Sequence, residues 1–201
     1  MLDPRIAVAF GSANSELREL TQAEGQQLKA DYEAATALGR KAGKRSCKEL
    51  RESKEVVSIC NGLSSDGLTL LGTLGPVLPA LEELRLCEPA ASPDGVQRLA
   101  EKLGAGAMPA LAVLYLPDMH VGDAGASALA AALGRGTLPR LKWLYLTNTA
   151  IGDAGLVALA PALRRLPALQ ALLLDGNPFG DEGLAALVAP PRRQVLRRRR
   201  L

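Results

Sequence analysis

The chain of 201 residues is long enough for one folded domain with its own core, and its 48% hydrophobic and 22% charged residues are ordinary for a globular protein. Aromatic residues make up only 3%, which favours a core of many thin, similar layers of Leu and Ala. No apolar run approaches the roughly 18 residues that a membrane span needs. The N-terminus lacks a convincing signal-peptide cleavage site, so we expect an intracellular protein, in the cytoplasm or in an organelle.

The net charge of +3 is the sum of three unlike segments. Residues 1–54 carry ten Lys or Arg and eight Asp or Glu, residues 55–191 carry eight and thirteen, and residues 192–201 carry six Arg and no acid. These counts give +2, −5 and +6. The acidic middle segment should repel a phosphate backbone, so we expect no specific binding of nucleic acid.

The segment 1–54 predicts a helical N-terminal cap that includes a basic stretch. From Ser15 to about Leu38 apolar residues recur on one side of a helix, which is expected to cover the start of the folded body. Those residues are Leu17, Leu20, Leu28, Tyr32, Ala35 and Leu38. A second short helix is expected within residues 40–54, with Cys47 and Leu50 facing inward.

Four segments with the pattern LxxLxL define the folded body. They are LPALEELRL (78–86), MPALAVLYL (108–116), LPRLKWLYL (138–146) and LPALQALLL (166–174), so their starts recur at a nearly constant spacing. Eleven residues after the second leucine of each LxxLxL pattern (Leu84, Leu114, Leu144 and Leu172) comes a glycine, at Gly95, Gly125, Gly155 and Gly183, followed by a helical pattern. A degenerate copy from Val56 to Leu71 begins the series. A fixed period predicts a stack of similar units.

Each copy predicts one strand and one helix, because alternate leucines share a face of a strand and leucines four apart share a face of a helix. Strands are expected near 56–60, 82–87, 112–117, 142–147 and 170–175, and helices near 94–103, 124–134, 154–165 and 182–188. Single units cannot bury their own apolar faces, so the units should stack into a right-handed α/β solenoid with a parallel sheet. We assign residues 55–189 to this domain and 190–201 to a disordered Arg-rich tail.

The LxxLxL strands, the loops with Asn148 and Asn177, and the helices that follow resemble the leucine-rich repeat over about two thirds of the chain. The period set by the four segment starts is similar to that of the ribonuclease-inhibitor type. The resemblance implies a short horseshoe with a concave parallel sheet and outer helices. It also implies a non-catalytic module that binds another protein.

Three aspartates stand at the starts of the expected helices: Asp123, Asp153 and Asp181. Asp is a preferred residue at helix N-termini, so each is expected to cap its own helix. The glycine that follows two residues later suits a close approach between backbones. The repeated carboxylates therefore need no catalytic explanation.

Strand alternation predicts which side chains face the open, concave side of the sheet. They form three columns across the repeats: Glu83, Val113, Trp143 and Ala171; Arg85, Tyr115, Tyr145 and Leu173; Cys87, Pro117, Thr147 and Asp175. Trp, Tyr and Arg dominate interface hot spots. We therefore expect a protein partner to bind Glu83, Arg85, Val113, Tyr115, Trp143, Tyr145, Leu173 and Asp175. The alternative is that the rings only stabilise the sheet by cross-strand packing.

The sequence predicts no catalytic, metal or cofactor site. The three cysteines, Cys47, Cys60 and Cys87, are too few and too scattered for a disulfide framework or a metal site. His120 is the only histidine, so no histidine pair is available for a metal. Residues 39–46 differ from a phosphate-binding loop in glycine spacing and in the residue that follows Lys44.

Two other functions stay open at this point. Some proteins resembling this repeat type activate small GTPases, but the strand-to-helix loops here contain neither Arg nor Lys, which argues against an arginine finger. A small structural subunit of a larger assembly is also compatible with the basic flanks and with the lack of a recognisable C-terminal cap. The Arg-rich tail either solubilises the chain or contacts an acidic surface.

Overall fold

The computed structural model describes residues 32–33, 36–37, 39–40, 44–59, 64–87 and 94–188. Five strands form one sheet in chain order, and every neighbouring pair is parallel. The strands are β1 (Glu55–Ile59), β2 (Glu83–Cys87), β3 (Val113–Tyr115), β4 (Trp143–Tyr145) and β5 (Ala171–Leu173). This parallel order confirms the predicted α/β solenoid.

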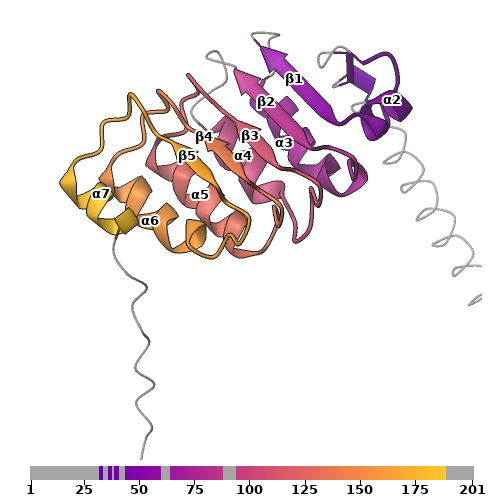
Figure 1. Cartoon of the computed structure of the whole chain (residues 1–201). Coiled ribbons are helices and arrows are strands. Elements are labelled where there is room, and N and C mark those ends of the chain that lie inside the picture. Colours follow the sequence, from indigo (N-terminus) through magenta and orange to yellow (C-terminus); the bar gives the residue numbers. More distant parts are fainter. Residues whose placement is uncertain are drawn as a thin grey trace, which may run out of the picture.

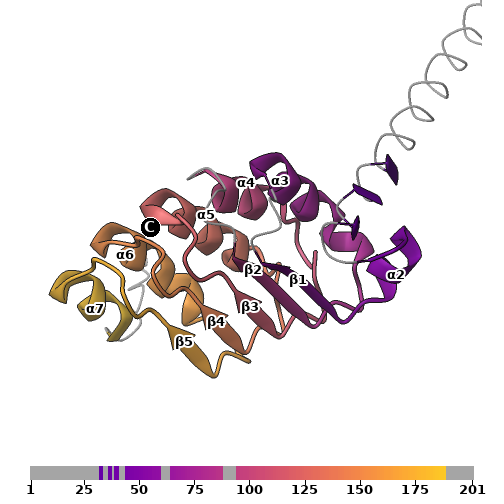
Figure 2. The same ribbon diagram turned by 90° about the horizontal axis from the view of Figure 1, so that it is seen from above.

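One helix follows each strand, and Figures 1 and 2 show these helices as a single layer on one side of the sheet. They are α3 (Ser65–Leu74), α4 (Gly95–Lys102), α5 (Gly122–Gly134), α6 (Asp153–Leu163) and α7 (Asp181–Val188). A short 3-10 turn, η1 (Gly75–Val77), follows α3. The opposite side of the sheet carries no helix among the described residues, and we call it the open sheet face. No described helix is long and apolar enough to cross a membrane.

The repeated leucines lie between the sheet and the helices, as the alternation predicted. In β2 the inward residues Leu84 and Leu86 are 1% and 0% exposed. The leucines at the same positions of the next two repeats are also buried: Leu114, Leu116, Leu144 and Leu146. The helices contribute Leu99, Leu129 and Leu159 to the same core. Each repeat therefore buries one thin leucine layer against its neighbours.

The last three strands are shorter than the sequence predicted. Each has three residues, and the residue three positions after it has positive φ, at Asp118 (55°), Asn148 (54°) and Gly176 (71°). A left-handed residue turns the chain out of the strand direction, and Asp, Asn and Gly tolerate that conformation best. Backbone hydrogen bonds between repeats still continue past the strands, for example from Leu146 N–H to Leu173 C=O at 2.9 Å.

At the N-terminal side, helix α2 (Cys47–Glu52) confirms the predicted second helix, and Leu50 is buried as expected. The Ser46 hydroxyl accepts a hydrogen bond from Glu49 N–H at 3.1 Å and caps the helix. Tyr32, expected on the apolar side of the longer predicted helix, is 64% exposed. Residues 32–33 and 36–37 are helical, as predicted, whereas the other residues of the predicted helix from Ser15, the Cys47 side chain and the tail 190–201 lie outside the described parts of the chain.

The prediction that the aspartates cap their own helices was wrong. Helices α5 and α6 have Val121 and Gly152 at their N-caps, and neither has a side-chain cap hydrogen bond from its own cap residue. Instead, Asp123 Oδ1 accepts hydrogen bonds from the backbone N–H groups of Gly152 (2.7 Å) and Gly155 (2.9 Å) in the next repeat. Asp123 therefore caps the following helix, α6, and the contact joins two repeats.

Asp153 repeats this contact one unit further along the chain. Its Oδ1 accepts hydrogen bonds from Gly180 N–H at 2.7 Å and from Gly183 N–H at 2.8 Å. The position of the glycine is crowded as predicted, but the nearest atom belongs to a side chain and not to the backbone: a Cβ at Gly183 would lie 2.7 Å from the same oxygen. We call this contact the aspartate clasp. Asp181, at the same position of the last described repeat, has no hydrogen-bond partner among the described residues.

Asn177 makes a second contact between repeats, in the opposite chain direction. Its side-chain oxygen accepts hydrogen bonds from Thr149 N–H and Ile151 N–H, both at 3.0 Å. Its amide donates to Leu146 C=O at 2.6 Å and to Leu174 C=O at 2.8 Å. Asn177 thus satisfies backbone groups of the loop before it. Asn148 lies one position earlier in its own loop, and among the described residues its side chain donates to Asp118 Oδ1 alone, at 2.9 Å.

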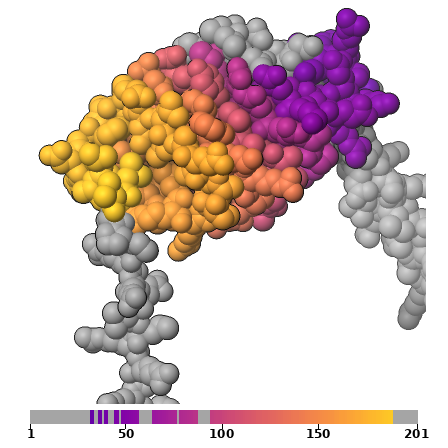
Figure 3. All heavy atoms as spheres, viewed as in Figure 1, coloured from indigo at the N-terminus to yellow at the C-terminus, as the bar shows by residue number. Residues whose placement is uncertain are grey.

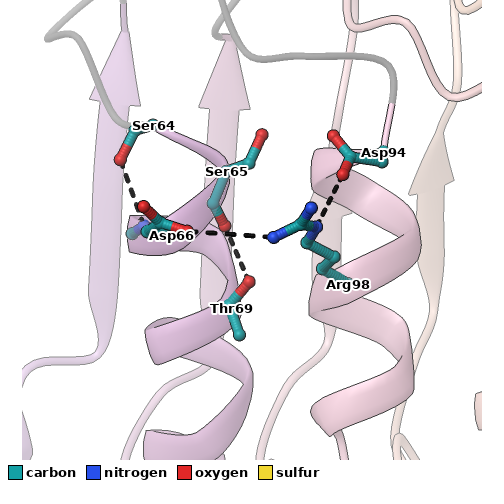
Figure 4. A network of polar contacts seen from close by, with 7 residues as sticks. Ser64, Ser65, Asp66, Thr69, Asp94 and Arg98 are labelled. Carbon is teal, nitrogen blue, oxygen red and sulfur yellow. Dashed lines mark hydrogen bonds and ion pairs between the residues drawn. The ribbon is translucent and has the colours of Figure 1, made fainter.

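The side-chain contact between helices α3 and α4 differs from the aspartate clasp, as Figure 4 shows. Arg98 of α4 donates from Nε to Asp94 at 2.6 Å, and its Nη1 lies 3.8 Å from Asp66 Oδ1 of α3. The Ser64 hydroxyl accepts a hydrogen bond from Gly67 N–H and so caps α3 from within its own repeat. The early, degenerate repeat therefore uses a side-chain ion pair where later repeats use the aspartate clasp.

Candidate protein-binding surface

The first two predicted columns lie side by side on neighbouring strands. Parallel register pairs Glu83 with Val113, Val113 with Trp143, and Trp143 with Ala171. The same register aligns Arg85, Tyr115, Tyr145 and Leu173. Their leucine neighbours on either side point into the core, so these side chains belong to the open sheet face.

The aromatic rings of this face lie together. The centroids of Tyr115 and Tyr145 are 5.0 Å apart, with the ring planes tilted by 54°. That tilted arrangement is a favourable aromatic contact and is worth about 0.5–1.5 kcal/mol beyond the area it buries. Trp143 is 39% exposed, which is unusual for the largest apolar side chain of an aromatic-poor protein.

Arg85 lies at the N-terminal side of the rings and is held by two carboxylates. Its Nε donates a 2.5 Å hydrogen bond to Glu83 Oε1 and lies 3.7 Å from Glu55 Oε1. The hydrogen bond to Glu83 raises the pKa of Arg85 above its ordinary value, more than burial lowers it. The guanidinium stays half exposed, with 46% of the side-chain surface accessible. It is therefore oriented but still able to meet a partner.

Six of the eight predicted residues line one shared hollow of about 300 Å³: Glu83, Arg85, Val113, Tyr115, Trp143 and Tyr145. The hollow combines an apolar aromatic floor with a charged end at β2. A protein side chain of a partner would fit this volume. The arrangement supplies packing surface and hydrogen-bond donors.

The other predicted positions lie outside the hollow. Leu173 is half-buried and Asp175 is exposed, both at the β5 end. In the third column, Pro117 is buried instead of facing the open side, because β3 ends at Tyr115 and the chain turns at Asp118. The extrapolation of strand alternation to Pro117 was therefore wrong.

One member of the charged end was missed from the sequence. Glu55 belongs to the degenerate first repeat, and the register pairs it with Glu83. Aligning the first repeat with the second would have identified Glu55. The first repeat, however, lacks the full LxxLxL pattern that such an alignment needs. Glu55 does not line the hollow, but on β1 it places a second carboxylate 3.7 Å from Arg85.

Comparison with protein families gives one match. Residues 140–160 and 166–188 match the family model described as Leucine Rich repeat. No curated protein matches the sequence. Leucine-rich repeats generally mediate interactions between proteins and are typically non-catalytic. The two matched stretches, together with the five parallel strand–helix units, support a leucine-rich-repeat protein with an α/β solenoid fold.

Proposed function

We propose that this protein is a non-catalytic module that binds a protein partner on the open sheet face, as in the ribonuclease-inhibitor-like type of repeat. The observation that carries the proposal is the exposed Trp143 beside the Tyr115–Tyr145 pair in a hollow of about 300 Å³. The centre of a binding interface is typically an aromatic cluster that excludes water once the partner docks.

The charged end of the hollow supports the same proposal. Arg85 is fixed by Glu83 and Glu55, so little side-chain entropy is lost when a partner accepts a further hydrogen bond from the guanidinium. Arg with neighbouring aromatic residues is the composition typical of hot spots. Packing between Tyr115 and Tyr145 stabilises the sheet as well, but that contact leaves the Trp143 surface uncovered.

The test is a quantitative pull-down with Trp143→Ala and Tyr145→Ala variants, followed by affinity measurement on the partner recovered. We expect each variant to weaken binding by roughly 2 kcal/mol or more. Val157→Ala is the matched control, because Val157 is 44% exposed on α6, away from the open sheet face. Circular dichroism checks that the repeats remain folded.

Full affinity in both aromatic variants would overturn the proposal and would direct attention to the helical side or the basic flanks. A GTP-hydrolysis assay with small GTPases is a separate control. Stimulated hydrolysis would replace the non-catalytic function with a regulatory one.

A further inference from the structure

Helix α7 exposes an apolar face that the preceding helix buries. Leu156 of α6 is 0% exposed, whereas Leu184, at the same position of α7, is 51% exposed. The outward stripe of α7 consists of Asp181, Leu184, Ala185 and Val188, at the i, i+3, i+4, i+7 spacing of one helix face. Val188 is 77% exposed. In α6 the residues at the positions of Leu184 and Val188, which are Leu156 and Ala160, are buried, so Leu184 and Val188 mark the surface that a further helix would cover.

The sheet ends at the same side of the molecule. Among the described strands β5 pairs only with β4, so its other edge has free backbone groups. The core leucines at this edge are only partly covered: Leu172 and Leu174 are half-buried, while Leu144 and Leu146 of the preceding repeat are 1% and 0% exposed. Figure 3 shows this end of the body opposite the N-terminal part. A free strand edge beside an apolar helix face is a ready surface for association.

The charged residues at this end are complementary to the same residues of a second copy. Asp181 and Glu182 are both exposed in the first turn of α7. At the other end of the helix, Arg164 Nη2 donates a hydrogen bond to Ala186 C=O, and Arg164 is exposed. If two α7 helices packed antiparallel, the acidic end of each would face Arg164 of the other. The stretch 189–201, with six arginines, contains no LxxLxL pattern that would indicate a further repeat.

We propose that a second copy of this chain covers the α7 and β5 end, related by a two-fold axis. In this arrangement β5 pairs antiparallel with β5 of the other copy, and Leu184 and Val188 pack across the axis. A two-fold interface must be complementary to itself, which the apolar centre and the opposite charges at the two ends of α7 satisfy. The open sheet face stays free, so the two copies present two partner-binding hollows.

Sedimentation equilibrium of the full chain tests the proposal. We expect a dimer at concentrations on the order of 50 µM, because such an edge interface is small and its affinity modest. Leu184→Glu and Val188→Glu should each raise the dissociation constant at least tenfold. Val157→Glu is the matched control on α6 and should leave it within twofold. Circular dichroism of each variant confirms that the fold is retained.

Charge reversal tests the antiparallel arrangement. Asp181→Lys and Arg164→Glu should each weaken the dimer severalfold, and the double variant should recover most of the lost affinity. A double variant weaker than both single variants would overturn the antiparallel arrangement. A chain that stays monomeric at the same concentration, or a dimer unaffected by both Leu184→Glu and Val188→Glu, would overturn the proposal. The first result would assign the covering of α7 to residues 189–201 or to a different protein.

Discussion

Oδ1 of Asp153 accepts a 2.8 Å hydrogen bond from the backbone N–H of Gly183, thirty residues further along the chain. The side chain of one repeat thereby satisfies a donor at the start of the next helix. A helix start leaves several backbone N–H groups without partners, and a carboxylate there also meets the positive end of the helix dipole. The aspartate clasp therefore stabilises the interface between repeats.

Removal of this carboxylate should destabilise the C-terminal repeat. Asp153→Ala is expected to lower the free energy of unfolding by about 1–2 kcal/mol, the usual cost of losing a helix cap. Asp181→Ala is the control, because Asp181 occupies the same position with no hydrogen-bond partner among the described residues. Urea denaturation of dilute samples compares the two variants. Equal stability losses would show that the clasp contributes nothing specific.

Two helix glycines should respond oppositely to alanine. A Cβ at Gly155 would lie 2.6 Å from Asp123 Oδ1 and 2.8 Å from Ile151 Cγ2, so Gly155→Ala must displace the clasp. We expect a loss of about 2 kcal/mol, comparable to overpacking a core. At Gly134, in the last turn of α5, no atom lies within 4 Å of the added Cβ. Gly134→Ala should leave stability unchanged or raise it by up to about 1 kcal/mol. Thermal unfolding would contradict this reasoning if both variants shifted the same way.

Asn177→Ala should cost about 2–3 kcal/mol, because it leaves the backbone groups of the preceding loop without partners. Those groups include Thr149 N–H and Ile151 N–H. The control is Asn148→Gly, which removes one exposed hydrogen bond and suits the positive φ at that position. Hydrogen exchange at the Ile151 amide reports the effect directly. Unchanged protection of that amide in Asn177→Ala would contradict the assigned role.

Two buried threonines should behave differently when replaced by valine. Thr137 Oγ1 is buried and has no hydrogen-bond partner within the described parts of the chain, and Ala107 stands at the same position one repeat earlier. Thr137→Val should therefore raise the free energy of unfolding by about 1 kcal/mol, since an unsatisfied hydroxyl is removed. The Thr149 hydroxyl donates to Leu146 C=O at 2.9 Å and lies 3.0 Å from Asn177 Oδ1, so Thr149→Val should lower it by a similar amount. Chemical denaturation distinguishes the two signs.

Most of the fold was predictable because it repeats in the sequence. The alternation of Leu84 and Leu86 gave the inward face of a strand, and four copies of that pattern gave the register of the sheet. The columns of the open sheet face followed from the same alternation as far as the strands extend. Beyond them the extrapolation failed at Pro117, since a strand pattern contains no information about where a left-handed residue turns the chain.

The contacts between repeats were harder to predict than the elements. An aspartate next to a helix start is the ordinary signature of a cap for that helix. Whether Asp123 instead accepts hydrogen bonds from Gly152 and Gly155 depends on how neighbouring repeats are placed relative to one another. The sequence pattern of a single repeat does not contain that information. Glu55 was missed for a related reason, because the first repeat lacks the leucine pattern that would have aligned it.

The aspartate clasp also determines where the chain can gain or lose residues. From the second leucine of each LxxLxL pattern to the following glycine the distance is eleven residues in all four complete repeats. From that glycine to the next repeat it is thirteen residues after Gly95 and Gly125 but eleven after Gly155, and α5 has 13 residues where α6 has 11. Both ends of the strand-to-helix loops are bonded to neighbouring repeats, so an insertion there would separate a carboxylate from its two amides. The connections after the helices are bonded to neighbouring repeats as well, for example from Gly106 N–H to Gly136 C=O at 3.2 Å. A change of length at the C-terminal end of a helix nevertheless leaves the carboxylate contacts in place, which agrees with the shorter α6.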